Sequence, residues 1–264
     1  MNLNKSLLLI ACLCLLGTPA FTQSSNYNLF NPVPKDQMRE FSIDRPDVTE
    51  SQVTVDAGHF QFEGDLYKWS EFDAGNVINV FNGLYKMGLT KNWDIHLGVE
   101  LYNIYQDPDG ETVEKGYGNT TIRLKRNLWG NEGDTKTALG MIPYVTLPTS
   151  PLYHDAVYGI GFPFSLTLTE KLGSGAQFQF DFLPIDGDYK LAYLQTVVLG
   201  GELIGALDFY VEGMGYFVEG ESLFNANGGL IYNITDNVKI DVATNVGLND
   251  GAPTKAYLGL SFRL

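Results

Sequence analysis

Cysteine is almost absent from this sequence. The 264 residues include two cysteines, Cys12 and Cys14, and both lie in a short apolar stretch near the start of the chain. One positive charge precedes that stretch and small residues up to Ala20 follow it, which is the pattern of a cleaved secretory signal. We therefore expect residues 1–22 to form a signal peptide, with cleavage after Ala20 or after Thr22. A chain processed in this way contains no cysteine, which excludes disulfide and thiolate chemistry.

Two other interpretations of the start of the chain stay open. The residues before Cys12 resemble a lipoprotein box, in which that cysteine would carry a lipid, although the apolar stretch continues past it. A buried N-terminal helix is the second interpretation. The apolar stretch is too short to cross a bilayer as a helix, which takes about 20 residues.

Basic residues and long apolar runs are also scarce. Lysine and arginine together number 17 against 31 aspartates and glutamates, which gives a net charge of −14. Binding to nucleic acid requires a basic face that neutralises phosphates, so we expect no nucleic-acid partner. No stretch of about 18 apolar residues follows the predicted signal, and we therefore expect no transmembrane helix.

Histidine is limited to His59, His96 and His154. No two of them share a close spacing, so the sequence predicts no metal site, and nothing in it indicates a cofactor. His154 lies near Ser150 and Asp155, but this spacing matches no nucleophile motif that we can support. We therefore predict no catalytic residues, and hydrolase activity stays open only as a minor alternative.

Aromatic residues and glycine are abundant, with 16 Phe, 15 Tyr and 29 Gly. Apolar and polar residues alternate with a period of two over long stretches, such as residues 93–101 and 254–264. In the first stretch Ile95 and Leu97 share one face, and His96 lies on the other. This period places alternate side chains on opposite faces of a strand, whereas a helix would scatter them around its circumference.

The alternation predicts about twelve strands, and ten to fourteen are compatible with it. Most are about twice as long as the 5–6 residues of ordinary strands and suit a tilted membrane strand of about 9–11 residues. The predicted fold class is all-β: a transmembrane, antiparallel, up-and-down β-barrel over residues 57–264, preceded by a non-barrel segment, residues 23–56. The predicted strands are 58–69, 76–89, 93–105, 116–129, 135–147, 156–169, 175–184, 189–199, 205–217, 222–234, 238–248 and 254–264.

The connections favour a barrel over a β-sandwich, which would also alternate. Turns after even-numbered strands are short, as in residues 90–92, whereas the longest connections, 106–117 and 148–156, follow odd-numbered strands. Short periplasmic turns and longer outer loops are typical of outer-membrane barrels, in which periplasmic termini require an even number of strands. Pro143 and Pro163 fall inside predicted strands, and each suggests a bulge.

Four short segments resemble a known family. They are residues 44–51 (DRPDVTES), 54–63 (TVDAGHFQFE), 142–148 (IPYVTLP) and 259–264 (GLSFRL). Together they resemble the outer-membrane β-barrel proteins of the phenol-degradation meta-pathway family, which are labelled as transporters. The family's usual phrase has a proline where this chain has Gln52. The resemblance extends over essentially the whole chain after the signal, and it implies an outer-membrane barrel with a transport role but says little about the solute.

Charged residues on the inward face of the predicted strands are candidates for lining the lumen. Both signs occur among them, so they either line a narrow path for a solute or pair across the lumen and hold its shape. The predicted lumen-lining residues are Glu63, Glu100, Arg123, Lys125, Asp181, Glu212 and Asp241.

Residues 23–56 contain few strand signals and a dense charged cluster, which we predict to form a plug or gate at the periplasmic mouth. We expect Arg45 to pair with an inward carboxylate such as Glu63 or Glu100, because a buried arginine–carboxylate pair would order the segment. A flexible periplasmic tail is the alternative. The predicted gate residues are Asp44, Arg45, Asp47 and Glu50.

The predicted function is passive diffusion of small solutes, including apolar or aromatic compounds, through a partly plugged channel in the bacterial outer membrane. The expected partners are the solute, outer-membrane lipid and lipopolysaccharide, and the barrel-assembly machinery. Acidic residues dominate the predicted outer loops and should concentrate cations at the entrance. A structural or accessory barrel with a filled lumen is the first alternative, and an outer-membrane hydrolase is the second.

Overall fold

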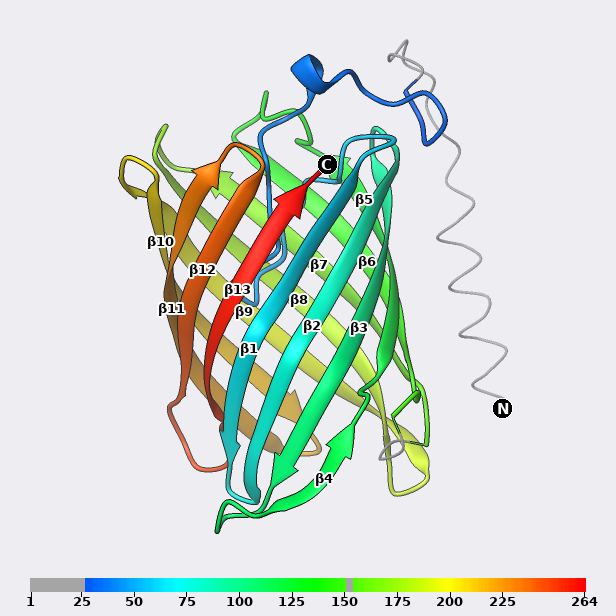
Figure 1. Cartoon of the computed structure of the whole chain (residues 1–264), viewed down its shortest axis with the longest axis vertical. Helices are drawn as coiled ribbons and strands as arrows, with labels where there is room; N and C mark the ends of the chain where they lie inside the picture. Colours follow the sequence, from blue (N-terminus) through cyan, green and yellow to red (C-terminus); the bar gives the residue numbers. More distant parts are fainter. Residues whose placement is uncertain (1–26, 151–153) are drawn as a thin grey trace.

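The computed structural model describes residues 27–150 and 154–264, so the predicted signal peptide lies outside the described residues. Twelve antiparallel strands close into a barrel, because β2 pairs with both β1 and β3 and the remaining strands pair in chain order (Figure 1). The short strand β4 adds to β3 beside the ring. The strands are β1 (Phe60–Phe72), β2 (Gly75–Thr90), β3 (Trp93–Gln106), β4 (Thr112–Gly116), β5 (Thr120–Trp129), β6 (Thr137–Leu147), β7 (Val157–Thr167), β8 (Leu172–Ile185), β9 (Asp188–Ile204), β10 (Leu207–Val218), β11 (Glu221–Thr235), β12 (Val238–Gly247) and β13 (Thr254–Arg263).

The predicted fold class is confirmed: the chain has the architecture of a transmembrane up-and-down β-barrel. In the described ranges no helix combines the length and apolarity needed to cross a membrane. Among residues 27–150 and 154–264, the one helical element is the 3₁₀ turn η1 (Lys35–Gln37), which lies over the barrel rim where β13 ends (Figure 1). We call this end the near rim and the opposite end the far rim.

Burial is inverted relative to a water-soluble protein. On β3 the outward-facing Ile95 and Leu97 are 41% and 43% exposed, whereas the inward-facing Asp94 and His96 are 0% and 1% exposed. Exposed apolar side chains recur on the outer face of most of the strands. A surface of this kind is stable only against an apolar solvent, which is what a lipid bilayer supplies.

The strand boundaries differ from the predicted ones mainly at turns. β9 continues to Ile204, and a two-residue turn that includes Gly205 (φ 59°) joins it to β10. Two-residue turns also occur at the far rim, at residues 186–187 and 219–220, where all four residues have positive φ. Such turns match the twist of long strands. The far rim therefore carries the long connections but also some of the tightest turns.

The two strand prolines interrupt hydrogen bonding without bulges, which corrects the prediction. The β5–β6 register runs unchanged past Pro143, but Leu124, which lies opposite it, and the next residue, Lys125, have no ladder partner on β6. The β6–β7 register likewise runs unchanged past Pro163. A proline lacks the N–H donor, so the ladder loses bonds there while the strands stay in phase.

Residues 27–59 are not part of the ring of strands, and both ends of this range are bound to the near rim. Asn28 bridges to Thr90, and the His59 ring bonds to the carbonyl oxygens of Val33 and Leu264. From η1 the chain descends into the barrel (Figure 1). It returns beside β2 at Gly88, where an added Cβ would lie 2.0 Å from the Asp56 carbonyl oxygen, so only glycine fits.

Candidate functional site

The interior of the barrel holds residues 39–56, which we call the lumen segment. It contains no strand, and inward side chains of the wall accept its backbone N–H groups. Glu63 accepts from Asp44 N at 2.7 Å, and Asp94 accepts from Val55 N at 2.7 Å. Buried backbone groups require such partners, so the wall replaces the bonds that a sheet would supply. Further bonds of this kind join Val48 and Thr49 to Glu212, Glu50 to Gln177, and Thr54 to Asn131.

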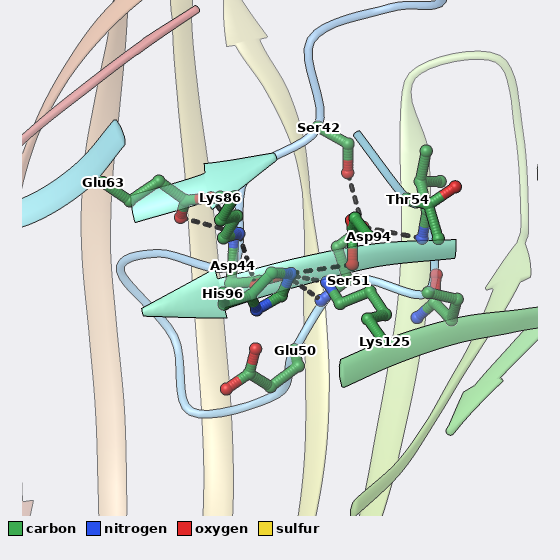
Figure 2. Close-up of polar contacts among 12 residues, drawn as sticks. Ser42, Asp44, Glu50, Ser51, Thr54, Glu63, Lys86, Asp94, His96 and Lys125 are labelled. Carbon is green, nitrogen blue, oxygen red and sulfur yellow. Dashed lines mark hydrogen bonds and ion pairs between the residues drawn. The ribbon is translucent and has the colours of Figure 1, made fainter. Parts of the chain in front are cut away.

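Asp44 is bound by two lysines of the barrel wall. It lies 2.5 Å from Lys86 Nζ and 2.7 Å from Lys125 Nζ, and it accepts from Ser51 N at 2.9 Å (Figure 2). Lys86 also contacts Glu63. Burial alone would raise the pKa of Asp44, but Lys125 and Lys86 outweigh it and hold that pKa well below its ordinary value. Asp44 is therefore ionised in the lumen.

Arg45 pairs with two wall carboxylates. Its guanidinium lies 2.6 Å from Asp65 and donates to both oxygens of Asp241 at 2.8 and 3.2 Å, and it faces the ring of Tyr257. Burial opposes the charge of Arg45, but Asp65 and Asp241 raise its pKa above the ordinary value. An added Cβ at Gly259 would lie 2.0 Å from Arg45 Nη2, so this glycine makes the room for the guanidinium.

The expectation that Arg45 pairs with Glu63 or Glu100 is wrong, because its partners are Asp65 and Asp241. Glu63 is bound to Lys86 and to the backbone of Asp44. Glu100 accepts a hydrogen bond from Asn103 at 2.8 Å instead. The sequence identifies an inward carboxylate as the partner, but the depth that Arg45 reaches in the barrel decides which carboxylate it meets.

Glu50 forms an ion pair with Arg123 through one of its two oxygens. Within the described residues, Glu50 Oε2 and Arg123 Nε are buried without a hydrogen-bond partner. Burial raises the pKa of Glu50 to about 7, an effect that Arg123 opposes and Asp44 increases. This pair therefore uses less of its bonding capacity than the Arg45 pairs.

Among the four predicted gate residues, Asp47 is the one that no ion pair joins to a side chain of opposite charge in the described part of the chain. Burial raises its pKa well above the ordinary value, and the nearby Glu212 adds to the effect. Glu212 itself accepts from Thr49 Oγ1 and from Asn227.

The predicted lumen-lining residues fall into two groups. Five of them contact the lumen segment directly, and these are Glu63, Arg123, Lys125, Glu212 and Asp241. Glu100 and Asp181 instead bond to wall residues, Asn103 and Tyr144 respectively. Their roles in solute passage stay predictions.

Lys86 is the main site residue that sequence reasoning missed. On β2 the inward positions include Asn79 and Lys86, which are buried although seven positions apart, so the period of two breaks between them. The break coincides with Phe81, which has a φ of 56°. Counting by twos from Asn79 would place Lys86 on the lipid side. One other argument could have indicated Lys86. An ionised carboxylate such as Asp44 needs a basic partner inside a barrel, and a lysine can supply it.

A cavity of about 1520 Å³ lies between the lumen segment and strands β7 to β13. Asp47 and Glu50 line its inner part, and Asn237 and Leu264 line it at the near rim. No group of three or more His, Cys, Asp or Glu side chains within residues 27–150 and 154–264 is arranged to hold a metal ion.

The fold and the site together define a transmembrane β-barrel that holds a segment of its own chain in a polar lumen. Residues 43–264 match the family described as "Putative MetA-pathway of phenol degradation", and the chain belongs to this family. No curated protein matches the sequence.

Several solved structures share the fold at low sequence identity. An outer-membrane channel from Pseudomonas putida F1 is 12% identical with a TM-score of 0.58, over 84% of this chain and all of that one. The NanC porin is 11% identical with a TM-score of 0.55, over 78% of this chain and 100% of its own. The KdgM porin is 12% identical with a TM-score of 0.54, over 76% and 98%.

Proposed function

We propose that this protein is a channel of the bacterial outer membrane that carries small solutes, with the lumen segment as its plug. The observation that carries the proposal is an enclosed lumen whose polar wall binds a strand-free peptide through side chains. A peptide held in this way can leave without breaking the barrel, because no ladder of the ring depends on it. The structural relatives include proteins whose names describe them as porins and as an outer-membrane channel.

The near-rim cavity serves as a vestibule in this proposal. It ends at the lumen segment, where Asp47 and Glu50 line it. Solute moves between this vestibule and the far half of the lumen when the segment shifts. The name of the family refers to phenol degradation, so small aromatic compounds are the first solutes to try.

Conductance of the purified protein in planar lipid bilayers tests the proposal. Arg45→Ala removes the contacts to Asp65 and Asp241 and should raise the single-channel conductance or the open time severalfold. Lys190→Ala, which removes a partly exposed pair with Glu219 at the far rim, is the matched control. Equal current for Arg45→Ala and the wild type would contradict the role of the lumen segment as a plug.

A structural or accessory barrel is the second candidate, and one observation favours it. Several inward side chains, including Lys86, His96 and Gln177, are almost completely buried, as in a filled lumen. Liposome swelling with neutral solutes of increasing size separates the two candidates. Uptake of any solute by the Arg45→Ala protein supports a channel, and no uptake by either protein supports the structural barrel.

A further inference from the structure

Three basic side chains of the wall form one face of the lumen. Lys86 comes from β2, and Arg123 and Lys125 come from β5, with β3 between the two strands. Lys86 and Lys125 are 2% and 1% exposed. Desolvated ammonium groups of this kind persist only beside an anion, because an unpaired buried charge costs several kcal/mol. We call these three residues the basic triad.

The anions that balance the basic triad come mostly from the lumen segment. Among the described residues, Lys125 forms an ion pair only with Asp44, and Arg123 only with Glu50. Lys86 pairs with Asp44 and with Glu63, its one partner on the wall. If the segment withdraws, the wall supplies two carboxylates to three cations: Glu63, which contacts Lys86, and Asp94, which lies opposite Lys125 and is itself bound to His96.

Withdrawal of the lumen segment therefore requires another anion to replace its carboxylates beside the basic triad. A neutral solute that displaced the segment would leave Arg123 without its counter-charge and Lys125 with only the carboxylate of Asp94, which His96 shares, whereas a solute carboxylate would replace the departing one. Charge-assisted hydrogen bonds from lysine and arginine to carboxylates are among the strongest in proteins. The pair most open to substitution is that of Glu50 and Arg123, in which one carboxylate oxygen and one guanidinium N–H have no described partner.

We propose that the basic triad is a binding site for the carboxylate of an organic acid, and that Asp44 and Glu50 occupy it as internal substitutes while the lumen segment is seated. This inference rests on the proposed channel function and narrows its solute to small carboxylates. Asp65 on β1 and Asp241 on β12 bind Arg45, so that side of the lumen is acidic. The basic triad is therefore the side of the lumen that selects an anion.

Calorimetric binding of benzoate to the full chain in detergent tests the site, with benzyl alcohol as the neutral probe of similar size. Glu50→Gln removes one substitute and should tighten benzoate binding about tenfold, the gain expected for one charge-assisted bond. The double variant Glu50→Gln with Arg123→Gln should lose that gain. Benzyl alcohol should bind all variants alike.

Two matched controls isolate the triad. Asp47→Asn removes a carboxylate of the same loop that has no basic partner among the described residues. Arg126→Gln removes a basic residue of β5 that packs on Trp93 instead of the lumen segment. Arg126→Gln should leave benzoate affinity unchanged, and Asp47→Asn should leave it unchanged or lower it. A gain for Glu50→Gln no larger than that for Asp47→Asn, or an equal gain for benzyl alcohol, would overturn the proposal.

The binding experiment is independent of conductance, so the two proposals can fail separately. If no variant conducts but benzoate binding follows the expected order, the carboxylate site holds and the channel function fails. If Arg45→Ala conducts and benzoate binding is unaffected by Glu50→Gln, the channel function holds and the carboxylate site fails. Circular dichroism of each variant verifies that the barrel is folded.

Discussion

At the scale of single residues, two carboxylates of one loop behave in opposite ways. Asp44 is surrounded by Lys86 and Lys125, and its pKa lies well below the ordinary value. Asp47, three positions later, has a raised pKa because burial and Glu212 disfavour its charge. The loop is therefore held in the lumen by specific ion pairs and not by its acidic character as such.

Asp44→Asn should loosen the lumen segment strongly. The change leaves Lys125 without its ion-pair partner, and breaking a buried pair on one side costs about 3–5 kcal/mol. Hydrogen exchange measures the effect through the backbone amides of Thr49 and Val55, whose protection should fall by about a hundredfold or more. Asp47→Asn should leave protection unchanged or raise it, and a comparable loss in both variants would contradict the assignment.

Acidification from about pH 7 to 4.5 should stabilise the state in which the lumen segment is bound inside the barrel (the seated state) relative to the state in which it is released. The pKa of Glu50 rises from 4.5 to about 7 on burial, so the seated state binds the proton more readily than the released state. The seated state therefore gains stability as pH falls through this window and loses it as pH rises. Asp47 has a pKa shifted in the same direction and acts in the same sense.

Single-channel recordings at pH 5 and pH 7.5 measure this dependence, with lower conductance or open time expected at pH 5. Glu50→Gln should weaken the dependence, and Glu50→Gln combined with Asp47→Asn should remove most of it. Conductance that rises on acidification would contradict the sign. Asp44 does not contribute in this window, because its lowered pKa keeps it ionised throughout.

At the scale of elements, the strands were predictable because a period of two needs only local information. The sequence interval 93–101 alternates without a break, and β3 begins at Trp93 as expected. β4 was missed because it lies in a predicted loop and pairs with only four residues of β3. The inward position of Lys86 was missed because the positive φ of Phe81 changes the phase of β2, and no composition rule signals that conformation.

The lumen segment was predictable only as a charged element that must contact the lumen. Its exact partners depend on how far it descends, and that depth follows from three-dimensional fit. Gly259 gives space to Arg45, and Gly88 gives space to the backbone of Asp56. A glycine that serves a partner distant in sequence looks like any other glycine of a strand, so the sequence offered no signal for either contact.

The turn at residues 219–220 offers a test at the element scale. Glu219 has a φ of 49° and Gly220 a φ of 87°, the left-handed conformations that two-residue hairpin turns require. Asparagine tolerates this region better than glutamate, so Glu219→Asn should stabilise the barrel by about 0.5 kcal/mol. Reversible urea unfolding from lipid vesicles measures the change. Lys190→Gln isolates the loss of the exposed ion pair with Glu219 and should be nearly neutral.

At the scale of the whole molecule, the barrel reverses the usual distribution of polarity. Its interior buries lysine, glutamate and asparagine, and its exterior exposes valine, leucine and phenylalanine. A barrel wall in lipid accounts for both faces at once. In water, the exposed apolar side chains of the outer face would be unfavourable, and the interior of the protein would be expected to be apolar. The lumen segment and the wall then form one polar network inside an apolar cylinder.

Two valines of equal exposure provide the sharpest test of this arrangement. Val197 lies near the middle of β9 on the outer face, and Val113 lies on β4, outside the ring; both are 63% exposed. In water, lysine at either position would be nearly neutral. In a bilayer, Val197→Lys places a charge near the midplane and should cost about 2–4 kcal/mol, whereas Val113→Lys remains near neutral. Urea titration of both variants from lipid vesicles measures the difference directly. Equal stability of the two variants would mean that Val197 does not face hydrocarbon, and a chain whose β9 faces water could not be a membrane channel of any kind.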